Sequence, residues 1–391
     1  MSYIKGDYIS DEGLKSIRGY KYQPGEYSTL DKILTPFWNF VVTLFPKSVA
    51  PNTITLLGVF IVSACYSSML YYDMSMTKPL PEWTYLLSGF GIFVFQTFDA
   101  IDGKQARRTD SSSPLGQLFD HGCDAITWTV TSLSVVSFLQ LGLTNDAILA
   151  MFATTSPFYL TNLLEYYSGV YEYNIAHVDG TTGQWLLIMC NLFPFIYGNN
   201  FYDRPVGEIL FFLPNILTDG FICRDYAMII LAYVGVIYSI VLIVYLLKSA
   251  SGIKNIFIVS MQMLQMFGVF FIMAAFDETI PFINENAGWV YVEITLLYSI
   301  ITTKLIVCLM SKMYYSFIHF EYLVFGIYFY FQYNYQPNSA EHDMQIKYAF
   351  WVTFAIYLFL YLRLVQTCIN QIAENLGIYC FSLQKRKQKD N

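Results

Sequence analysis

Long apolar segments recur along almost the whole chain and limit its possible folds more than any other feature. A helix that crosses a lipid bilayer needs about 20 mostly apolar residues. By that rule the sequence contains about ten candidates. They are residues 53–72, 83–101, 115–141, 147–167, 185–197, 226–247, 256–276, 289–310, 315–333 and 348–368. The sequence therefore predicts an all-α polytopic membrane protein with about ten transmembrane helices, plus or minus one or two.

The composition supports this prediction. Only 13% of the residues are charged and 55% are hydrophobic, whereas about 25% of an ordinary soluble chain is charged. The net charge of −7 does not suggest a nucleic acid as partner, since such proteins usually present a basic field. The seven cysteines are scattered, and no pair has the spacing of a metal finger. We interpret them as reduced packing residues.

Charged residues between the apolar segments predict the orientation. Basic residues mark the cytosolic side of a membrane protein. They gather in alternate connections and in the C-terminal tail, at Lys104, Arg107, Arg108, Lys248, Lys254, Lys312, Lys385, Arg386, Lys387 and Lys389. Both termini and the connection after the second segment are therefore expected to face the cytosol. Residues 30–45 are apolar with few charges, and we expect an interfacial helix there, although a plain connector is the alternative. Residues 209–217, interrupted by Pro214, form an interfacial or re-entrant candidate.

The stretch from Asp99 to Asp124, DAIDGKQARRTDSSSPLGQLFDHGCD, carries the chemistry. Asp99 and Asp102 are three residues apart, and Asp120 and Asp124 are four apart, so each pair shares one face of a helix. Ser113 followed by Pro114 is a start signal for the second of these helices. The acids would otherwise be helix caps or solvated helix ends, but four carboxylates beside two membrane helices favour a shared function.

Four carboxylates packed together near lipid repel one another and lose hydration, a cost that divalent cations would remove. Oxygen ligands select hard ions, so we expect Mg²⁺, with Mn²⁺ or Ca²⁺ as alternatives, in preference to zinc. Two such ions would suit phosphoryl transfer. Arg107 can hold a phosphate, and Lys104 can add positive charge.

These residues match the pattern D-x-x-D-G-x-x-A-R-x8-G-x3-D-x3-D, and the chain thereby resembles the CDP-alcohol phosphotransferases. The sequence segments DGKQARRT and SSSPLGQLFDHGCD resemble those of the eukaryotic choline and ethanolamine phosphotransferases in particular. The segment APNTIT at residues 50–55 resembles the start of the first span in the same enzymes. The resemblance implies that Asp99, Asp102, Asp120 and Asp124 bind two metal ions. It also implies a cradle for the CDP group, formed by Asn52, Gly103, Ala106, Arg107 and Gly116.

The same resemblance implies transfer of phosphocholine or phosphoethanolamine to diacylglycerol, with release of CMP. The hydroxyl of diacylglycerol needs a base, and His121 suits proton transfer at neutral pH. Asp124 is the rival, but a metal-bound carboxylate is a weaker base. We favour His121. Glu165, followed by Tyr166 and Tyr167, is a candidate for holding the ammonium group of the substrate, with a helix-end residue as the alternative.

The resemblance also implies a homodimer in the endoplasmic reticulum or Golgi membrane, with the catalytic face in the cytosol. We expect residues 1–50 to be a cytosolic N-terminus with the interfacial helix, 51–250 the catalytic membrane core, 251–375 further transmembrane helices for dimer contacts or lipid access, and 376–391 a basic cytosolic tail. A related enzyme with inositol or glycerol phosphate as acceptor is one alternative. A membrane transporter is another, but it would spread its charges along a central path.

Overall fold

The computed structural model describes residues 7–20, 28–169, 179–212, 214–250 and 252–384. In these ranges the chain is mostly helical and contains no strand, although an isolated antiparallel bridge joins Pro205 and Ile222. The all-α prediction is thereby confirmed. The α-helices are α1 (Asp11–Arg18), α2 (Thr29–Leu44), α3 (Pro51–Tyr72), α4 (Glu82–Arg108), α5 (Pro114–Phe138), α6 (Asn145–Ser168), α7 (Gly180–Tyr197), α8 (Val206–Ile209), α9 (Asn215–Thr218), α10 (Cys223–Ser249), α11 (Ile253–Ala274), α12 (Pro281–Glu285), α13 (Ala287–Ser311), α14 (Phe325–Tyr333) and α15 (Ala340–Leu376).

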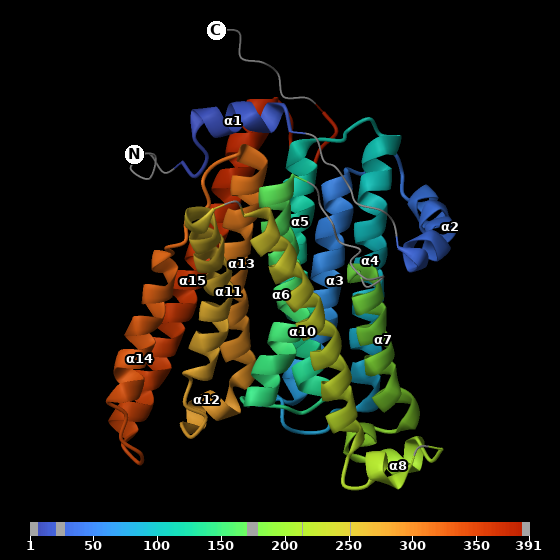
Figure 1. Ribbon diagram of the computed structural model, residues 1–391, viewed down its shortest axis with the longest axis vertical. Coiled ribbons are helices and arrows are strands. Elements are labelled where there is room, and N and C mark those ends of the chain that lie inside the picture. Colours follow the sequence, from blue (N-terminus) through green and yellow to red (C-terminus); the bar gives the residue numbers. More distant parts are fainter. Residues whose placement is uncertain (1–6, 21–27, 170–178, 213, 251, 385–391) are drawn as a thin grey trace.

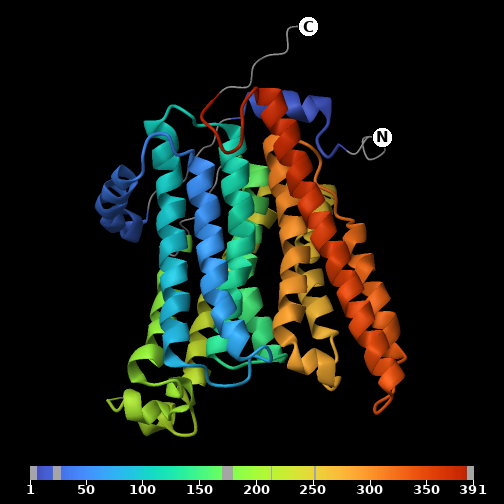
Figure 2. The same ribbon diagram turned by 180° about the vertical axis from the view of Figure 1, so that it is seen from behind.

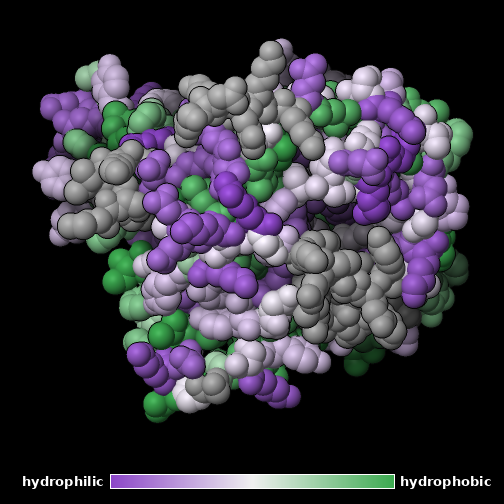
Figure 3. Space-filling model, turned by 90° about the horizontal axis from the view of Figure 1, so that it is seen from above, coloured by the Kyte–Doolittle hydropathy of each residue, from purple (hydrophilic) through white to green (hydrophobic). Residues whose placement is uncertain are grey.

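The long helices run side by side along one axis (Figures 1 and 2), while α1 lies across one end of the bundle and α2 lies beside it. The start of α3, the end of α4 and the end of α15 are at the same end as α1. Hydrophilic side chains gather over much of this end (Figure 3). The connection between α4 and α5, which bears the acidic motif on either side, therefore lies at the polar end of the bundle.

Within the described residues, seven helices are long and apolar enough to cross a membrane, namely α3, α4, α6, α10, α11, α13 and α15. This supports an integral membrane protein, but the predicted count of ten is not confirmed. Three of the ten predicted segments correspond to α5, to α7 and to the region of α14. Helix α5 carries Asp120, Asp124 and many Thr and Ser residues, and α7 has only 18 residues. The segment 315–333 is not one helix, because α14 has nine residues and follows a short 3-10 turn, Phe320–Val324.

Helix α2 confirms the helix expected at residues 30–45. It begins with a capping box, in which the Ser28 hydroxyl accepts from the Asp31 N–H and the Asp31 carboxylate accepts from the Ser28 N–H. Its outer face exposes large apolar side chains at a helical spacing, Ile33, Phe37, Phe40 and Leu44. Such a face suits the membrane interface. The location of α2 at that interface stays a prediction. The predicted interfacial piece at 209–217 contains the last residue of the short helix α8 and all of α9 except Thr218.

Small residues bring the helices around the motif close together, as is common between membrane helices. A Cβ added to Gly91 of α4 would lie 2.8 Å from the Cβ of Cys65 in α3. One added to Gly235 of α10 would lie 2.2 Å from the carbonyl oxygen of Ala153 in α6. Pro157 has no N–H to offer that carbonyl. These crossings fix α4 beside α3 and hold α10 against α6, where Ala153 and Gly235 both line the cavity described below.

The larger of two clusters of buried apolar residues extends from Ile9 to Ala373. Both proposed membrane parts, 51–250 and 251–375, contribute to it, so their separation stays a prediction. The basic residues expected from 385 onward lie outside the described residues.

Candidate active site

Two helices and their short connection position the acidic motif. Helix α4 ends at Arg108, and its cap Thr109 is followed by Asp110 with a positive φ of 51°. Helix α5 begins at Pro114 after the N-cap Ser113, whose hydroxyl accepts from the N–H of Gly116 at 3.1 Å. This is the predicted start signal. The tight turn between the two helices places the carboxylates of α4 beside those of α5.

Three of the four predicted carboxylates meet. Asp99, Asp120 and Asp124 each offer an oxygen, and these oxygens lie within 4.8 Å of one another. Asp102 lies close enough for its charge to interact with those of Asp99 and Asp120. Its Oδ2 also accepts a hydrogen bond from the hydroxyl of Thr55 on α3. The structure therefore assembles a carboxylate cluster from Asp99, Asp102, Asp120 and Asp124.

The residues of this cluster fit a divalent metal. One oxygen of Asp99 and one of Asp120 are buried without any hydrogen-bond partner, although buried polar groups are nearly always partnered. In the part of the chain that the structure describes, no Lys, Arg or His forms a salt bridge with the cluster. An all-oxygen, anionic donor set is what hard cations such as Mg²⁺ prefer.

Two cavities meet at the carboxylate cluster. The first cavity, of about 360 Å³, extends from the cluster between α5, α6, α7 and α10 and has apolar walls at Phe158, Leu187 and Leu231. The second cavity, of about 600 Å³, lies at the polar end, under the connection 109–113 and the segment 378–384. Five residues line both cavities: Asp102, Gly103, Arg107, Asp120 and His121.

The predicted nucleotide cradle lies around the second cavity. Asn52, Gly103, Ala106, Arg107 and Gly116 all line it. A Cβ on Gly103 or on Gly116 would come no closer than 3.6 Å to other protein atoms. Packing within the chain therefore does not require glycine there, which leaves contact with a ligand as a reason for both. Lys104 lines the first cavity instead, and its ammonium donates to Oδ1 of Asn39 on α2 at 2.9 Å.

His121 and Glu165 differ in their position relative to these cavities. His121 is buried and lines both of them, and its ring interacts with the side chain of Asn162 on α6. Glu165 is also buried, but it lines neither cavity. Its Oε1 accepts from the hydroxyl of Tyr20 at 3.2 Å, which in turn accepts from Gln117 at 3.1 Å. Burial and the nearby Glu165 carboxylate raise the pKa of Tyr20.

Comparison with known proteins agrees with this geometry. Residues 48–194 match the family model described as CDP-alcohol phosphatidyltransferase. The chain is 30% identical over 398 residues, 98% of both chains, to the Uncharacterized CDP-alcohol phosphatidyltransferase class-I family protein 1 of Dictyostelium discoideum. The chain belongs to the CDP-alcohol phosphatidyltransferase family. The family depends on divalent metal ions, which agrees with the carboxylate cluster.

Relatives with a named activity match this family member over about half its length. Choline/ethanolaminephosphotransferase 2 of Arabidopsis thaliana is 36% identical, with 51% of each chain covered. Cholinephosphotransferase 1 of Rattus norvegicus is 35% identical, with 58% of each chain covered. The chain thus spans about half the length of these enzymes in each match. These similarities support a membrane-bound transferase that uses CDP-alcohols.

Sequence reasoning missed two further parts of this family member's site. Asp31 at the start of α2 and Asp179 before α7 are buried and line the first cavity. The capping pattern S-x-x-D at Ser28 could have marked Asp31 as a helix cap, but not as a cavity residue. Six residues of the segment 378–384, which was expected to be part of a cytosolic tail, line the second cavity, and no local pattern marks them for that position.

Proposed function

We propose that the protein transfers phosphocholine, phosphoethanolamine or both from the CDP-alcohol to diacylglycerol, producing phosphatidylcholine or phosphatidylethanolamine and CMP. One observation carries the proposal: the carboxylate cluster lies where a polar cavity and an apolar-walled cavity meet. A reaction between a nucleotide and a lipid needs such a meeting point. The chain is similar over about half its length to enzymes named as choline and choline/ethanolamine phosphotransferases, and this similarity supports the choice of substrates.

The second cavity is the proposed site of the CDP group. Arg107, whose guanidinium forms a fork of donors, would bind a phosphate oxygen pair. Gly103, Ala106 and Gly116 would leave the space in which the nucleotide contacts the helix backbone, and Asn52 lines the same cavity beside Gly116. Lys104 adds positive charge on the side of the first cavity.

Asp99, Asp102, Asp120 and Asp124 would hold the metal, with two Mg²⁺ ions proposed and Mn²⁺ as a substitute. When bound, the metal neutralises charge on the diphosphate and on the leaving oxygen. The chain's own contribution is to hold the four carboxylates together, through Thr55 for Asp102 and through the adjoining turns of α4 and α5 for the others.

His121 is proposed to accept the proton of the diacylglycerol hydroxyl. The hydroxyl oxygen forms a bond to the phosphorus that bears the amino alcohol, and the bond from that phosphorus to the CMP oxygen breaks. The leaving CMP takes the electron pair of the broken bond. His121 suits the role because it lines both cavities beside Asp120. Asp124, which lines the first cavity only, is the alternative base.

The lipid acceptor is proposed to occupy the first cavity, where α6, α7 and α10 supply apolar walls. The polar end of the bundle is proposed to face the cytosol of the endoplasmic reticulum or Golgi membrane. Glu165 as a head-group ligand, homodimer formation and the division at residue 250 stay predictions.

The proposed function is tested with full-length protein purified in detergent. Diacylglycerol is offered together with CDP-choline, CDP-ethanolamine or CDP-diacylglycerol plus inositol, each with Mg²⁺ or with EDTA, and lipid products are measured by mass spectrometry. We expect phosphatidylcholine or phosphatidylethanolamine with Mg²⁺, and a loss of product with EDTA that added Mg²⁺ restores. Product only from CDP-diacylglycerol, or transport of intact CDP-choline into vesicles without product, would contradict the proposal.

The C-terminal segment 378–384 supports the second cavity and gives a further prediction. Nδ2 of Asn52 donates to the carbonyl oxygen of Cys380 at 2.9 Å, and Phe381 packs edge-on against Phe119 of α5 with ring centroids 5.3 Å apart. Phe381→Ala should raise the KM for the CDP-alcohol by about 2- to 10-fold, because an aromatic pair contributes about 0.5–1.5 kcal/mol. The KM for diacylglycerol should change by less.

The matched control for Phe381→Ala is Phe359→Ala, which removes an exposed aromatic ring of α15 that lines neither cavity. Steady-state kinetics with each substrate varied in turn decide the prediction. Equal changes in both KM values, or a change in kcat alone, would show that the segment does not shape the nucleotide site.

A further inference from the structure

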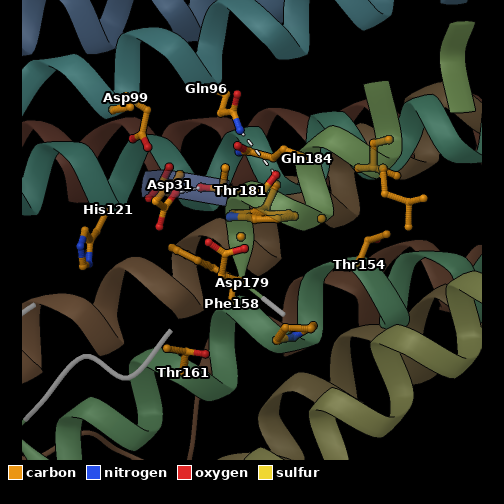
Figure 4. Close-up of a pocket in the computed structure, with 18 of the residues that line it drawn as sticks. Asp31, Gln96, Asp99, His121, Thr154, Phe158, Thr161, Asp179, Thr181 and Gln184 are labelled. Atoms are coloured by element: carbon orange, nitrogen blue, oxygen red, sulfur yellow. Dashed lines mark hydrogen bonds between the residues drawn. The ribbon is translucent and has the colours of Figure 1, made fainter. Parts of the chain in front are cut away.

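A second group of acids lies in the first cavity, apart from the family motif. Asp31 and Asp179 are each only 4% exposed and both line this cavity. Figure 4 shows Asp31, Asp179 and Thr181 close together, with Asp99 on the other side of Asp31. The charges of Asp31 and Asp179 interact, and so do those of Asp31 and Asp99. The negative field of the carboxylate cluster therefore continues from Asp99 into the first cavity.

Both acids are held firmly in place by local hydrogen bonds. Asp31 accepts from the N–H of Ser28 and, through Oδ1, from the hydroxyl of Thr181 at 2.8 Å. Asp179 caps α7 and accepts, through Oδ1, from the N–H of Thr182 at 2.9 Å. The bond between Thr181 and Asp31 joins the start of α7 to the start of α2. The two carboxylates are thus fixed at positions set by two helix ends.

Helix capping does not account for the whole of this arrangement. Oδ2 of Asp179 is buried and accepts no hydrogen bond. In the described part of the chain, neither acid forms a salt bridge. Burial raises the pKa of Asp31, and the charge of Asp179 adds to the rise. A buried, unpartnered carboxylate oxygen facing a cavity needs a cation or a donor from a ligand.

Two tryptophans complete the surroundings of these acids. Trp38 lies on the same face of α2 as Asp31. It is buried and lines the first cavity. Trp128 of α5 lines it as well and packs over the first turn of α7, since a Cβ on Gly180 would lie 3.3 Å from its ring. Indole faces attract organic cations, and carboxylates add charge.

From this geometry we infer that Asp31 and Asp179, with Trp38 and Trp128, form the site for the cationic head group of the CDP-alcohol. The inference rests on the proposed function and assigns a part of the same site. It places the positive nitrogen in the first cavity, beyond Asp99 from the nucleotide. This differs from the sequence-based prediction for Glu165, which lines neither cavity. A compact organic cation suits these four residues, because the two carboxylates supply negative charge and the two indole rings supply faces that attract a cation.

Binding of two CDP-alcohols that differ in head-group charge tests the inference. CDP-choline carries a cationic head group, and CDP-glycerol carries a neutral one on the same diphosphate. Calorimetry with full-length protein in detergent and Mg²⁺ should show that Asp179→Asn weakens CDP-choline binding about 10- to 100-fold, as expected for a charge-assisted contact. CDP-glycerol binding should stay within about twofold or improve. Asp31→Asn should act in the same direction.

Asparagine keeps an oxygen that can cap the helix, so these variants remove the charge and retain the capping group. The matched control is Asp225→Asn, which changes an acid that caps α10 by accepting from the Ile222 N–H at 2.9 Å and lines neither cavity. It should leave the affinity ratio of the two ligands unchanged. Thermal unfolding of each variant shows whether the fold is kept.

Three outcomes would overturn the inference. The ratio of the two affinities could stay unchanged in Asp179→Asn and Asp31→Asn. The ratio of the CDP-choline to the CDP-glycerol affinity could instead fall in Glu165→Gln alone, which would place the head group at Glu165. Titration with Mn²⁺ could show one bound ion fewer in Asp179→Asn, which would make the acids metal ligands. The proposed function can fail separately. If Asp179→Asn and Asp31→Asn lower the ratio of the CDP-choline to the CDP-glycerol affinity but the wild type forms no lipid product, the proposed function is wrong and the head-group site is retained.

Discussion

Asp120→Asn is expected to lower the transfer rate at least about 10³-fold, the largest effect of any single substitution. One of its oxygens is buried without a partner, and its carboxylate lies between Asp99, Asp102 and Asp124. An amide in this place removes a negative charge from the proposed metal site and points donors at it. Metal contributes several kcal/mol to transition-state stabilisation, and each 1.36 kcal/mol is a factor of ten in rate. The measurement is product formation from CDP-choline at saturating Mg²⁺.

Heat stability provides an independent check on the same variant. Without metal, four carboxylates repel one another, so Asp120→Asn should unfold at a higher temperature than the wild type in EDTA. Added Mg²⁺ should raise the Tm of the wild type more than that of the variant. Asp146→Asn, in the exposed first turn of α6, should change neither activity nor response to Mg²⁺. Full activity in Asp120→Asn would remove the basis of the metal site.

His121→Ala is expected to lower kcat by about 10²- to 10⁴-fold, the usual contribution of a general base. The substitution removes the ring that lines both cavities and leaves the four carboxylates in place. The Mg²⁺ concentration for half-maximal activity should therefore stay within about twofold, because the four carboxylates proposed to bind the metal are unchanged. The measurement is kcat as a function of Mg²⁺ at saturating substrates.

Asp124→Asn separates the two candidate bases. If His121 is the base and Asp124 a ligand, Asp124→Asn should raise the half-maximal Mg²⁺ concentration about tenfold or more. The opposite pattern, with little loss of kcat in His121→Ala and a large loss without a change in Mg²⁺ dependence in Asp124→Asn, would assign the base to Asp124. His342→Ala, at the start of α15, controls for the loss of a histidine.

The span count shows where sequence patterns are sufficient and where they fail. Each of the ten predicted segments overlaps a helix of the structure, because apolar length is a local property that hydropathy measures directly. The segment 315–333 was expected to be one span, yet only Phe325–Tyr333 is α-helical, after the 3-10 turn Phe320–Val324. There Tyr315 hydrogen-bonds to Tyr159 and Tyr166 of α6, and these contacts with a distant helix hold the chain in a non-helical path.

The sequence alone determined most of the long helices, the N-cap of α5 at Ser113, and the pairing of Asp99 with Asp102 and of Asp120 with Asp124. These features depend on spacing within one helix, and the helix repeat of 3.6 residues makes them readable. Sequence could also place both pairs near each other, since only a short turn joins α4 to α5.

Only the tertiary structure decided what surrounds the carboxylate cluster. Thr181 reaches Asp31 across 150 residues of chain, and Asn52 reaches Cys380 across 328. Helix packing brings these groups together, and no periodicity within a segment encodes such a contact. The proposed head-group site and the wall of the proposed nucleotide cavity therefore depend on the fold, whereas the acidic motif can be recognised in the sequence.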